Sequence, residues 1–178
     1  MKKNAFIPVV LFVIILSGFI QVKSPVKKTY GYKQASIPGI VPAYPEETDI
    51  QPVKTRPKQN YNYWFYLEIA GSEKINFTGL WISGVQHDIK AETITDLPVR
   101  KITITGVGKN DTTIMVPATK NKVLLVYPSG ESKNTKIYTK NTRQLISSNE
   151  LVIRYVWKNQ TYYSTIKKLK ELDPDVRP

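Results

Sequence analysis

Residues 61–70 alternate regularly between two sets of side chains, which is typical of a β-strand. One face of this strand holds large apolar residues, namely Tyr61, Tyr63, Phe65, Leu67 and Ile69. The opposite face holds Asn62, Trp64, Tyr66 and Glu68. The pattern predicts a strand with one face in the core and with Trp64 partly exposed. At the edge of a sheet, a strand of this length is a candidate to pair with another chain.

Short runs of the same kind recur along the chain, and turn residues separate many of them. The runs lie near residues 75–83, 85–95, 99–106, 112–117, 122–127, 135–139, 144–147, 150–157 and 161–168. No long segment shows a helical period. This spacing predicts an all-β fold, a single antiparallel β-sandwich (Ig-like or related) of about 7–10 short strands.

The last run, residues 161–172, fits a strand by its alternation and a helix by the spacing of its apolar residues. We expect a hairpin of residues 150–157 with 161–168, because the sequence Lys-Asn-Gln at 158–160 provides a turn between them. An irregular tail at 173–178 follows, since its two prolines interrupt either structure.

Residues 5–20 form an apolar run of 16 residues that follows two lysines, the layout of an export signal. A membrane-spanning helix needs about 20 apolar residues, or about 17 at least, so the length is borderline. Cleavage is disfavoured, because Pro25 directly follows the best small-residue match at 22–24. We expect an uncleaved N-terminal anchor helix in residues 1–23, with a cleaved signal peptide as the alternative.

The charges beside this run bear on its orientation. Lys2 and Lys3 precede it, and four lysines follow it before the first acid, Glu46. Positive residues tend to stay in the cytoplasm, so this balance does not favour export. We still expect export, because the N-terminal layout is that of a signal. The expected location is the inner membrane with a periplasmic or other extracytoplasmic domain, or secretion if the segment is cleaved.

Residues 24–60 contain six of the 12 prolines of the 178-residue chain. Proline removes a backbone donor and biases the preceding residue towards extended geometry. We therefore expect a proline-rich, extended or disordered linker here. The predicted organisation is an anchor or signal in 1–23, this linker in 24–60, a β-sandwich domain in 61–172 and a tail in 173–178.

The formal net charge is +12. It is spread along the chain: residues 1–60 carry 9 basic and 3 acidic side chains (+6), and residues 61–178 carry 17 and 11 (+6). The densest basic group is Lys120, Lys122, Lys133, Lys136, Lys140 and Arg143. A basic surface attracts polyanions, and it also serves simply as a solvated, solubilising surface.

Aromatic and basic residues alternate near the C-terminus in a way that suits stacking on sugars or bases, although cross-strand packing is the favoured explanation for aromatics in strands. The candidate surface for a ligand or partner consists of Trp64, Tyr66, Trp157, Tyr162, Lys158 and Lys167.

The sequence offers no catalytic or cofactor motif. It has one histidine, His87, and no cysteine, which excludes thiolate catalysis, disulfides and the usual zinc sites. Residues 106–111 contain Gly-x-Gly-Lys, but the flanking positions of a phosphate-binding loop, at Thr103 and Asn110, do not match. We expect no catalytic residue, no metal and no cofactor.

These features favour a non-catalytic protein for binding or assembly at the cell envelope. The expected contacts are the inner membrane, through residues 5–20, and an envelope protein or an anionic glycan. Two alternatives stay open. One is a carbohydrate-active or other hydrolytic enzyme, which needs converging carboxylates. The other is a cytoplasm-facing binder of polyanions or nucleic acid, although nucleic acid is not the expected partner.

Overall fold

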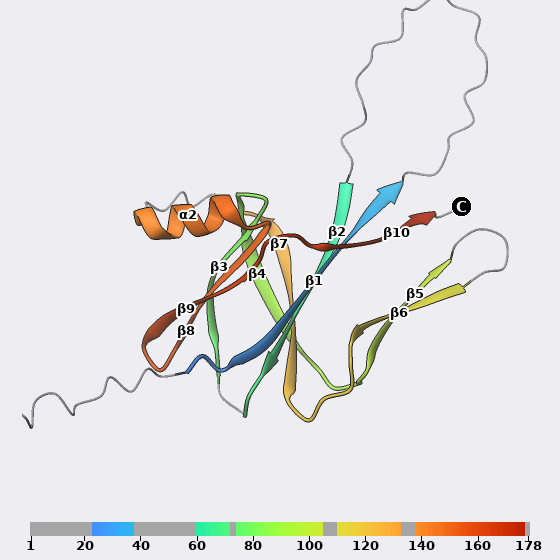
Figure 1. Ribbon diagram of the computed structural model, residues 1–178, viewed down its shortest axis with the longest axis horizontal. Helices are drawn as coiled ribbons and strands as arrows, with labels where there is room; N and C mark the ends of the chain where they lie inside the picture. The colour runs from blue at the N-terminus through green and yellow to red at the C-terminus, as the bar shows by residue number, and fades with distance from the viewer. Residues whose placement is uncertain (1–22, 38–59, 72–73, 105–109, 133–137, 177–178) are drawn as a thin grey trace, which may run out of the picture.

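A computed structural model of the protein describes residues 23–37, 60–71, 74–104, 110–132 and 138–176. Within these ranges the fold is all-β with one short helix (Figure 1). The elements are β1 (Val26–Ile37), β2 (Asn60–Ile69), β3 (Asn76–Ile82), β4 (Val85–Ile94), β5 (Val99–Ile104), β6 (Asn110–Val116), β7 (Lys122–Glu131), α2 (Lys140–Ser148), β8 (Leu151–Trp157), β9 (Gln160–Ile166) and β10 (Lys170–Val176).

Eight strands form one curled sheet in the order β10-β1-β2-β7-β4-β3-β8-β9, and β5 and β6 form a separate two-stranded ribbon. All neighbours are antiparallel except β1 and β10, which are parallel. The all-β prediction is confirmed. The two-sheet, Ig-like sandwich is not confirmed, and the purely antiparallel arrangement is wrong because β10 returns alongside β1.

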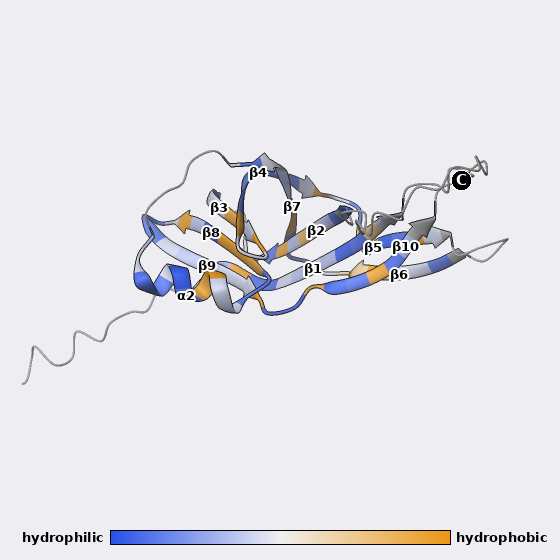
Figure 2. Cartoon of the chain, turned by 90° about the horizontal axis from the view of Figure 1, so that it is seen from above, coloured by the Kyte–Doolittle hydropathy of each residue, from blue (hydrophilic) through white to orange (hydrophobic). Residues whose placement is uncertain are grey.

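The sheet curls so that both of its outermost strands, β10 and β9, lie against β1 (Figure 2). Only residues 167–169 separate the terminal strands β9 and β10 along the chain. The side chains of Thr29 in β1 and Ser164 in β9 are hydrogen-bonded. Glycine at position 31 allows this close approach, since a Cβ atom there would lie 2.6 Å from Ile166 Cδ1 and Leu169 Cδ2, and both side chains would have to shift.

Glu150 holds this junction together. Its Oε1 accepts a hydrogen bond from Lys33 Nζ in β1 at 3.0 Å, and its Oε2 accepts one from the Leu169 backbone N–H at 2.8 Å. This bond and ion pair with Glu150 raise the pKa of Lys33 above its ordinary value. One carboxylate thus connects the start of β8 to both β1 and the segment between β9 and β10.

Two apolar clusters lie on the two faces of the sheet. The cluster inside the curl contains Phe65, Leu67, Leu80, Ile153 and Tyr155 among its buried members. The second cluster lies between the outer face of β1, β2, β7 and β10 and the β5–β6 ribbon, and it consists of Tyr32, Tyr66, Met115, Val116, Val123 and Leu172. The predicted alternation in 61–70 is confirmed, but both faces of β2 are covered.

Helix α2 covers part of the outer face of the sheet near β8 (Figures 1 and 2). Thr139 caps its N-terminus by accepting a hydrogen bond from the Thr142 N–H at 3.3 Å. A strand was expected at 144–147, and this prediction is wrong because these residues lie in the helix that Thr139 caps. The strand expected at 135–139 lies mostly outside the described residues.

The hairpin of β8 and β9 is confirmed, with Lys158 and Asn159 at positive φ in the turn. The linker boundary is wrong at its start, because residues 26–37 form β1 and pair with β2 along its whole length. The rest of that predicted linker, 38–59, lies outside the described residues. The tail is also wrong in part, since 173–176 belong to β10.

Two further expectations concern membranes and partners. Strand β2 lies between β1 and β7, so it is not an edge strand and has no free edge for another chain. Within the described ranges, no helix is long and apolar enough to cross a membrane. The anchor predicted in 1–23 lies almost entirely outside them.

Candidate functional site

The described surface has hollows of about 410, 440 and 510 Å³, and the one of about 510 Å³ lies between α2 and the outer faces of β3, β8 and β9. We call it the Arg154 hollow. Its lining consists of Thr78, Tyr138, Thr139, Thr142, Arg154, Val156, Thr161 and Tyr163. Six of these eight residues carry a hydroxyl group, so the hollow offers many donors and acceptors in a small volume.

Arg154 lies in the middle of β8 and points to the outer face, because its neighbours Ile153 and Tyr155 belong to the inner core. Its guanidinium is held from two directions. Nε donates to Thr78 Oγ1 at 3.0 Å, and Nη2 donates to the Thr78 carbonyl at 2.9 Å. These bonds fix the planar group in one orientation.

Two aromatic rings complete the support of the guanidinium. Its carbon lies 5.5 Å from the ring centre of Trp81 and 6.0 Å from that of Tyr138. The two rings meet edge to face, with centres 5.2 Å apart. Gly79 leaves room for the indole, since a Cβ atom there would lie 2.3 Å from Trp81 Cη2. At these distances the two rings attract the guanidinium through cation–π contacts, which are stronger for a group partly removed from water.

A chain of hydroxyl groups leads from the helix to the sheet. Thr142 Oγ1 lies 3.0 Å from Thr139 Oγ1 and 3.1 Å from the hydroxyl of Tyr163 in β9. The Tyr138 hydroxyl donates to Gln86 Oε1 in β4. The wall of the hollow is therefore anchored to β4 and β9, and it is preorganised rather than formed by free side chains.

The hollow is electropositive. No carboxylate lines it, and Arg154 is paired with no carboxylate among the described residues. The first turn of α2 contains no acidic residue but has Lys140 and Arg143. The positive end of the helix dipole adds to these charges. The arrangement favours a negatively charged group beside Arg154.

This chemistry suits recognition rather than catalysis. A guanidinium held in plane binds a carboxylate, phosphate or sulfate through two parallel hydrogen bonds. The surrounding hydroxyl groups both donate and accept, as the hydroxyl groups of a sugar do. No His, Asp, Glu or Lys is among the lining residues. In the described part of the chain, no three His, Asp or Glu side chains are grouped for a metal ion.

The structure separates the predicted ligand surface into two places. Trp64 is partly buried on the outer face of β2, where the Lys101 amine lies 4.2 Å from its ring centre. Tyr66 is 4% exposed, and its hydroxyl lies 3.8 Å from Met115 Sδ. Burial of this ring also raises its pKa. Tyr66 therefore packs in the second apolar cluster and cannot contact a ligand.

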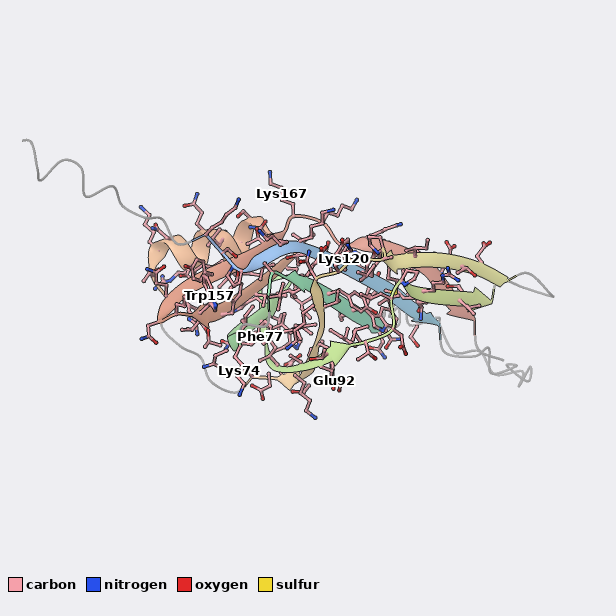
Figure 3. All side chains as sticks on the ribbon, turned by 90° about the horizontal axis from the view of Figure 1, so that it is seen from below. Lys74, Phe77, Glu92, Lys120, Trp157 and Lys167 are labelled. Carbon is pink, nitrogen blue, oxygen red and sulfur yellow. The ribbon has the colours of Figure 1, made fainter. Side chains whose placement is uncertain are left out.

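Trp157, Lys158 and Tyr162 do lie together, at the hairpin of β8 and β9. The Tyr162 ring lies 6.1 Å from that of Trp157 and stacks on that of Tyr155 at 5.8 Å. The Lys158 amine lies 4.5 Å from the Trp157 ring centre. Lys167 is exposed after β9 and projects away from them (Figure 3).

The predicted basic group is not one patch. Lys120 and Lys122 lie at the start of β7, whereas Lys140 and Arg143 lie in α2, which follows the opposite end of that strand. The ten residues of β7 span about 30 Å. Lys133 and Lys136 lie outside the described residues.

Sequence reasoning missed the residues of the Arg154 hollow. One signal was present: in Leu-Val-Ile-Arg-Tyr-Val-Trp (151–157), Arg154 is the only charged residue of a strand that is apolar on both faces. A strand buried on both faces rarely holds an unpaired charge without a reason. The threonines and tyrosines carry no comparable signal, because they are ordinary strand and cap residues.

Comparisons with known proteins find no matching family model, no similar curated protein and no similar solved structure.

Proposed function

We propose that the protein is a non-catalytic binding protein of the cell envelope, whose β-domain holds an acidic, hydroxyl-rich ligand in the Arg154 hollow. An acidic glycan has this chemistry. The observation that carries the proposal is Arg154 itself, a partly buried guanidinium fixed by Thr78 and by two rings, without a carboxylate partner among the described residues.

The alternatives receive less support. Hydrolysis of a glycan needs two carboxyl groups that flank the bond, and none lines the hollow. A binder of single-stranded nucleic acid stacks bases on exposed rings along a basic groove. Here the rings of Trp81 and Tyr138 are turned towards Arg154 and towards each other. The lining of the hollow and the orientation of these rings both favour a ligand with a single anionic group among hydroxyl groups over a long polyanion.

The envelope location is part of the proposal and rests on the sequence. The apolar run at 5–20 holds the domain at the inner membrane, on its extracytoplasmic side. An acidic glycan of the envelope is then within reach of the domain.

The test is a titration of the full-length protein in detergent with a hexasaccharide of alternating glucuronic acid and N-acetylglucosamine. We expect Arg154→Met to weaken binding roughly 10–150-fold, because a charge-assisted hydrogen bond contributes about 1.5–3 kcal/mol. Methionine keeps much of the apolar stem of arginine. The matched control is Arg100→Met, which makes the same change at an exposed arginine of β5 and should leave the affinity unchanged.

Two results would contradict the proposal. One is equal affinity of wild type and Arg154→Met for the acidic hexasaccharide, with both proteins folded by circular dichroism. The other is tighter binding of a short oligothymidylate, insensitive to Arg154→Met and steeply weakened by salt, which would favour a nucleic-acid binder.

A further inference from the structure

One end of the curled sheet is formed where β1 begins and where β2 and β8 end, and we call it the basal end. The Ala70 N–H donates to the Pro25 carbonyl at 2.9 Å, which joins the start of β1 to the end of β2. The Ser24 and Tyr155 hydroxyls lie 2.7 Å apart, which joins the same start to β8. The entry of the chain into the domain is thus fixed at this end.

A hollow of about 440 Å³ opens at the basal end. Its lining consists of Lys23, Ser24, Pro25, Lys27, Ala70, Gly71 and Trp157. Lys74 follows Gly71 closely, and Lys158 lies over the ring of Trp157 at 4.5 Å from its centre. Figure 3 looks at this end and shows Lys74 and Trp157 on the side of β8 and β9. The side chains of all four of these lysines, at 23, 27, 74 and 158, are exposed.

The composition of this surface suits a lipid headgroup layer. Among the described residues, no carboxylate lines the hollow. Lysine side chains suit such a surface, because their apolar stems lie along the protein while their amines meet lipid phosphates. Trp157 is 9% exposed, and its indole N–H has no acceptor among the described residues.

The sequence fixes how far this end can lie from a membrane. The apolar run ends at Ile20, and Lys23 is the first residue of the described domain. Three residue steps span at most about 11 Å. Ionic screening at physiological salt acts over about 8 Å. If residues 5–20 are embedded, Lys23 is therefore held near the range in which anionic lipid attracts it, and the other three lysines belong to the same end of the sheet.

We propose that the basal end is a membrane-docking face that rests on anionic lipid through Lys23, Lys27, Lys74 and Lys158. This inference rests on the anchoring part of the proposed function. Docking fixes the orientation of the domain and turns the Arg154 hollow, on the outer face of β8, sideways along the membrane surface.

The test uses full-length protein in nanodiscs of phosphatidylcholine, with and without phosphatidylglycerol. Acetylation of each lysine is followed by mass spectrometry. We expect Lys23, Lys27, Lys74 and Lys158 to react at least about threefold more slowly in the anionic discs, and this protection to disappear at high salt. Lys90 in β4 and Lys140 in α2 are internal controls that should react equally in both.

A triple variant sharpens the result. Lys27→Glu, Lys74→Glu and Lys158→Glu together should abolish the protection of Lys23 in anionic discs. Equal reactivity of the four basal lysines in the two kinds of disc, with the protein incorporated, would overturn the docking face and leave the anchor standing. A protein that does not enter the discs at all would overturn the anchor itself, and docking with it.

Discussion

Glu68 is the most completely buried acidic side chain among the described residues, at 7% exposure on the outer face of β2. Asn121 and Thr119 donate to its Oε1 at 2.6 and 2.7 Å, and the Tyr30 hydroxyl donates to Oε2 at 3.2 Å. The bonds from Asn121 and Thr119 hold the pKa of Glu68 below its ordinary value of 4.5, against the opposite effect of burial. This carboxylate fastens the turn before β7 to β2.

The lowered pKa of Glu68 predicts a particular dependence of stability on pH. Because the folded pKa lies below 4.5, the stabilisation is complete above that value and is lost as pH falls through the folded pKa. Glu68→Gln should be less stable than wild type at pH 7, by about 1–3 kcal/mol, and the difference should shrink in acid. Urea unfolding between pH 7 and 3 measures this. The control is Glu131→Gln at an exposed acid. If the free energy of unfolding of Glu68→Gln and of wild type changed with pH in parallel, the lowered pKa of Glu68 would be contradicted.

At the scale of elements, the closure of the sheet depends on strand β1, which sequence reasoning assigned to a linker. The inward positions in the middle of the strand are Thr29, Gly31 and Lys33, and none of them carries a large apolar side chain. Each of the three residues has a partner distant in sequence. Thr29 bonds to a hydroxyl of β9, a Cβ atom at Gly31 would lie too close to two side chains, and Lys33 pairs with the carboxylate of Glu150. Hydrophobic alternation therefore could not reveal β1.

Glu150 should contribute more to this closure than any exposed acid. We expect Glu150→Ala to lower the free energy of unfolding by about 2–3 kcal/mol, because it leaves the Lys33 amine and the Leu169 N–H without their acceptor. Hydrogen exchange should accelerate at residues 167–172. The control is Glu171→Ala, since that side chain is 58% exposed and 3.9 Å from Lys33, and its effect should be within about 0.5 kcal/mol. Similar losses in the two variants would argue against a closing role for Glu150.

At the scale of the whole molecule, alternation and turn spacing were enough to predict an all-β protein and the β8–β9 hairpin. They were not enough to predict one curled sheet, because pairing of the first strand with the last depends on contacts between residues more than a hundred positions apart. The Arg154 hollow also depends on contacts distant in sequence. It is lined by side chains of β3, β8, β9 and α2, and most of these residue types are ordinary in strands and caps. Only Arg154 carried a signal in the sequence.

The position of β1 predicts where the chain can be shortened. A protein that begins at residue 61, the expected domain boundary, lacks β1 and exposes the edge of β2 and the β10 pairing surface. We expect it to show no cooperative thermal transition by circular dichroism. A protein that begins at residue 23 keeps every described strand and should unfold cooperatively. Cooperative unfolding of the shorter protein would show that β1 is dispensable.

The measurement that tests the central claim most directly compares two ligands on two proteins. Wild type and Arg154→Met are titrated with the glucuronic acid hexasaccharide and with its carboxyl-reduced, neutral counterpart. If Arg154 recognises the acidic group, wild type prefers the acidic ligand at least tenfold, and Arg154→Met binds both ligands with similar affinity. This readout does not depend on the variant's overall stability, because each protein serves as its own reference. An equal preference for the acidic ligand in the two proteins would contradict the account.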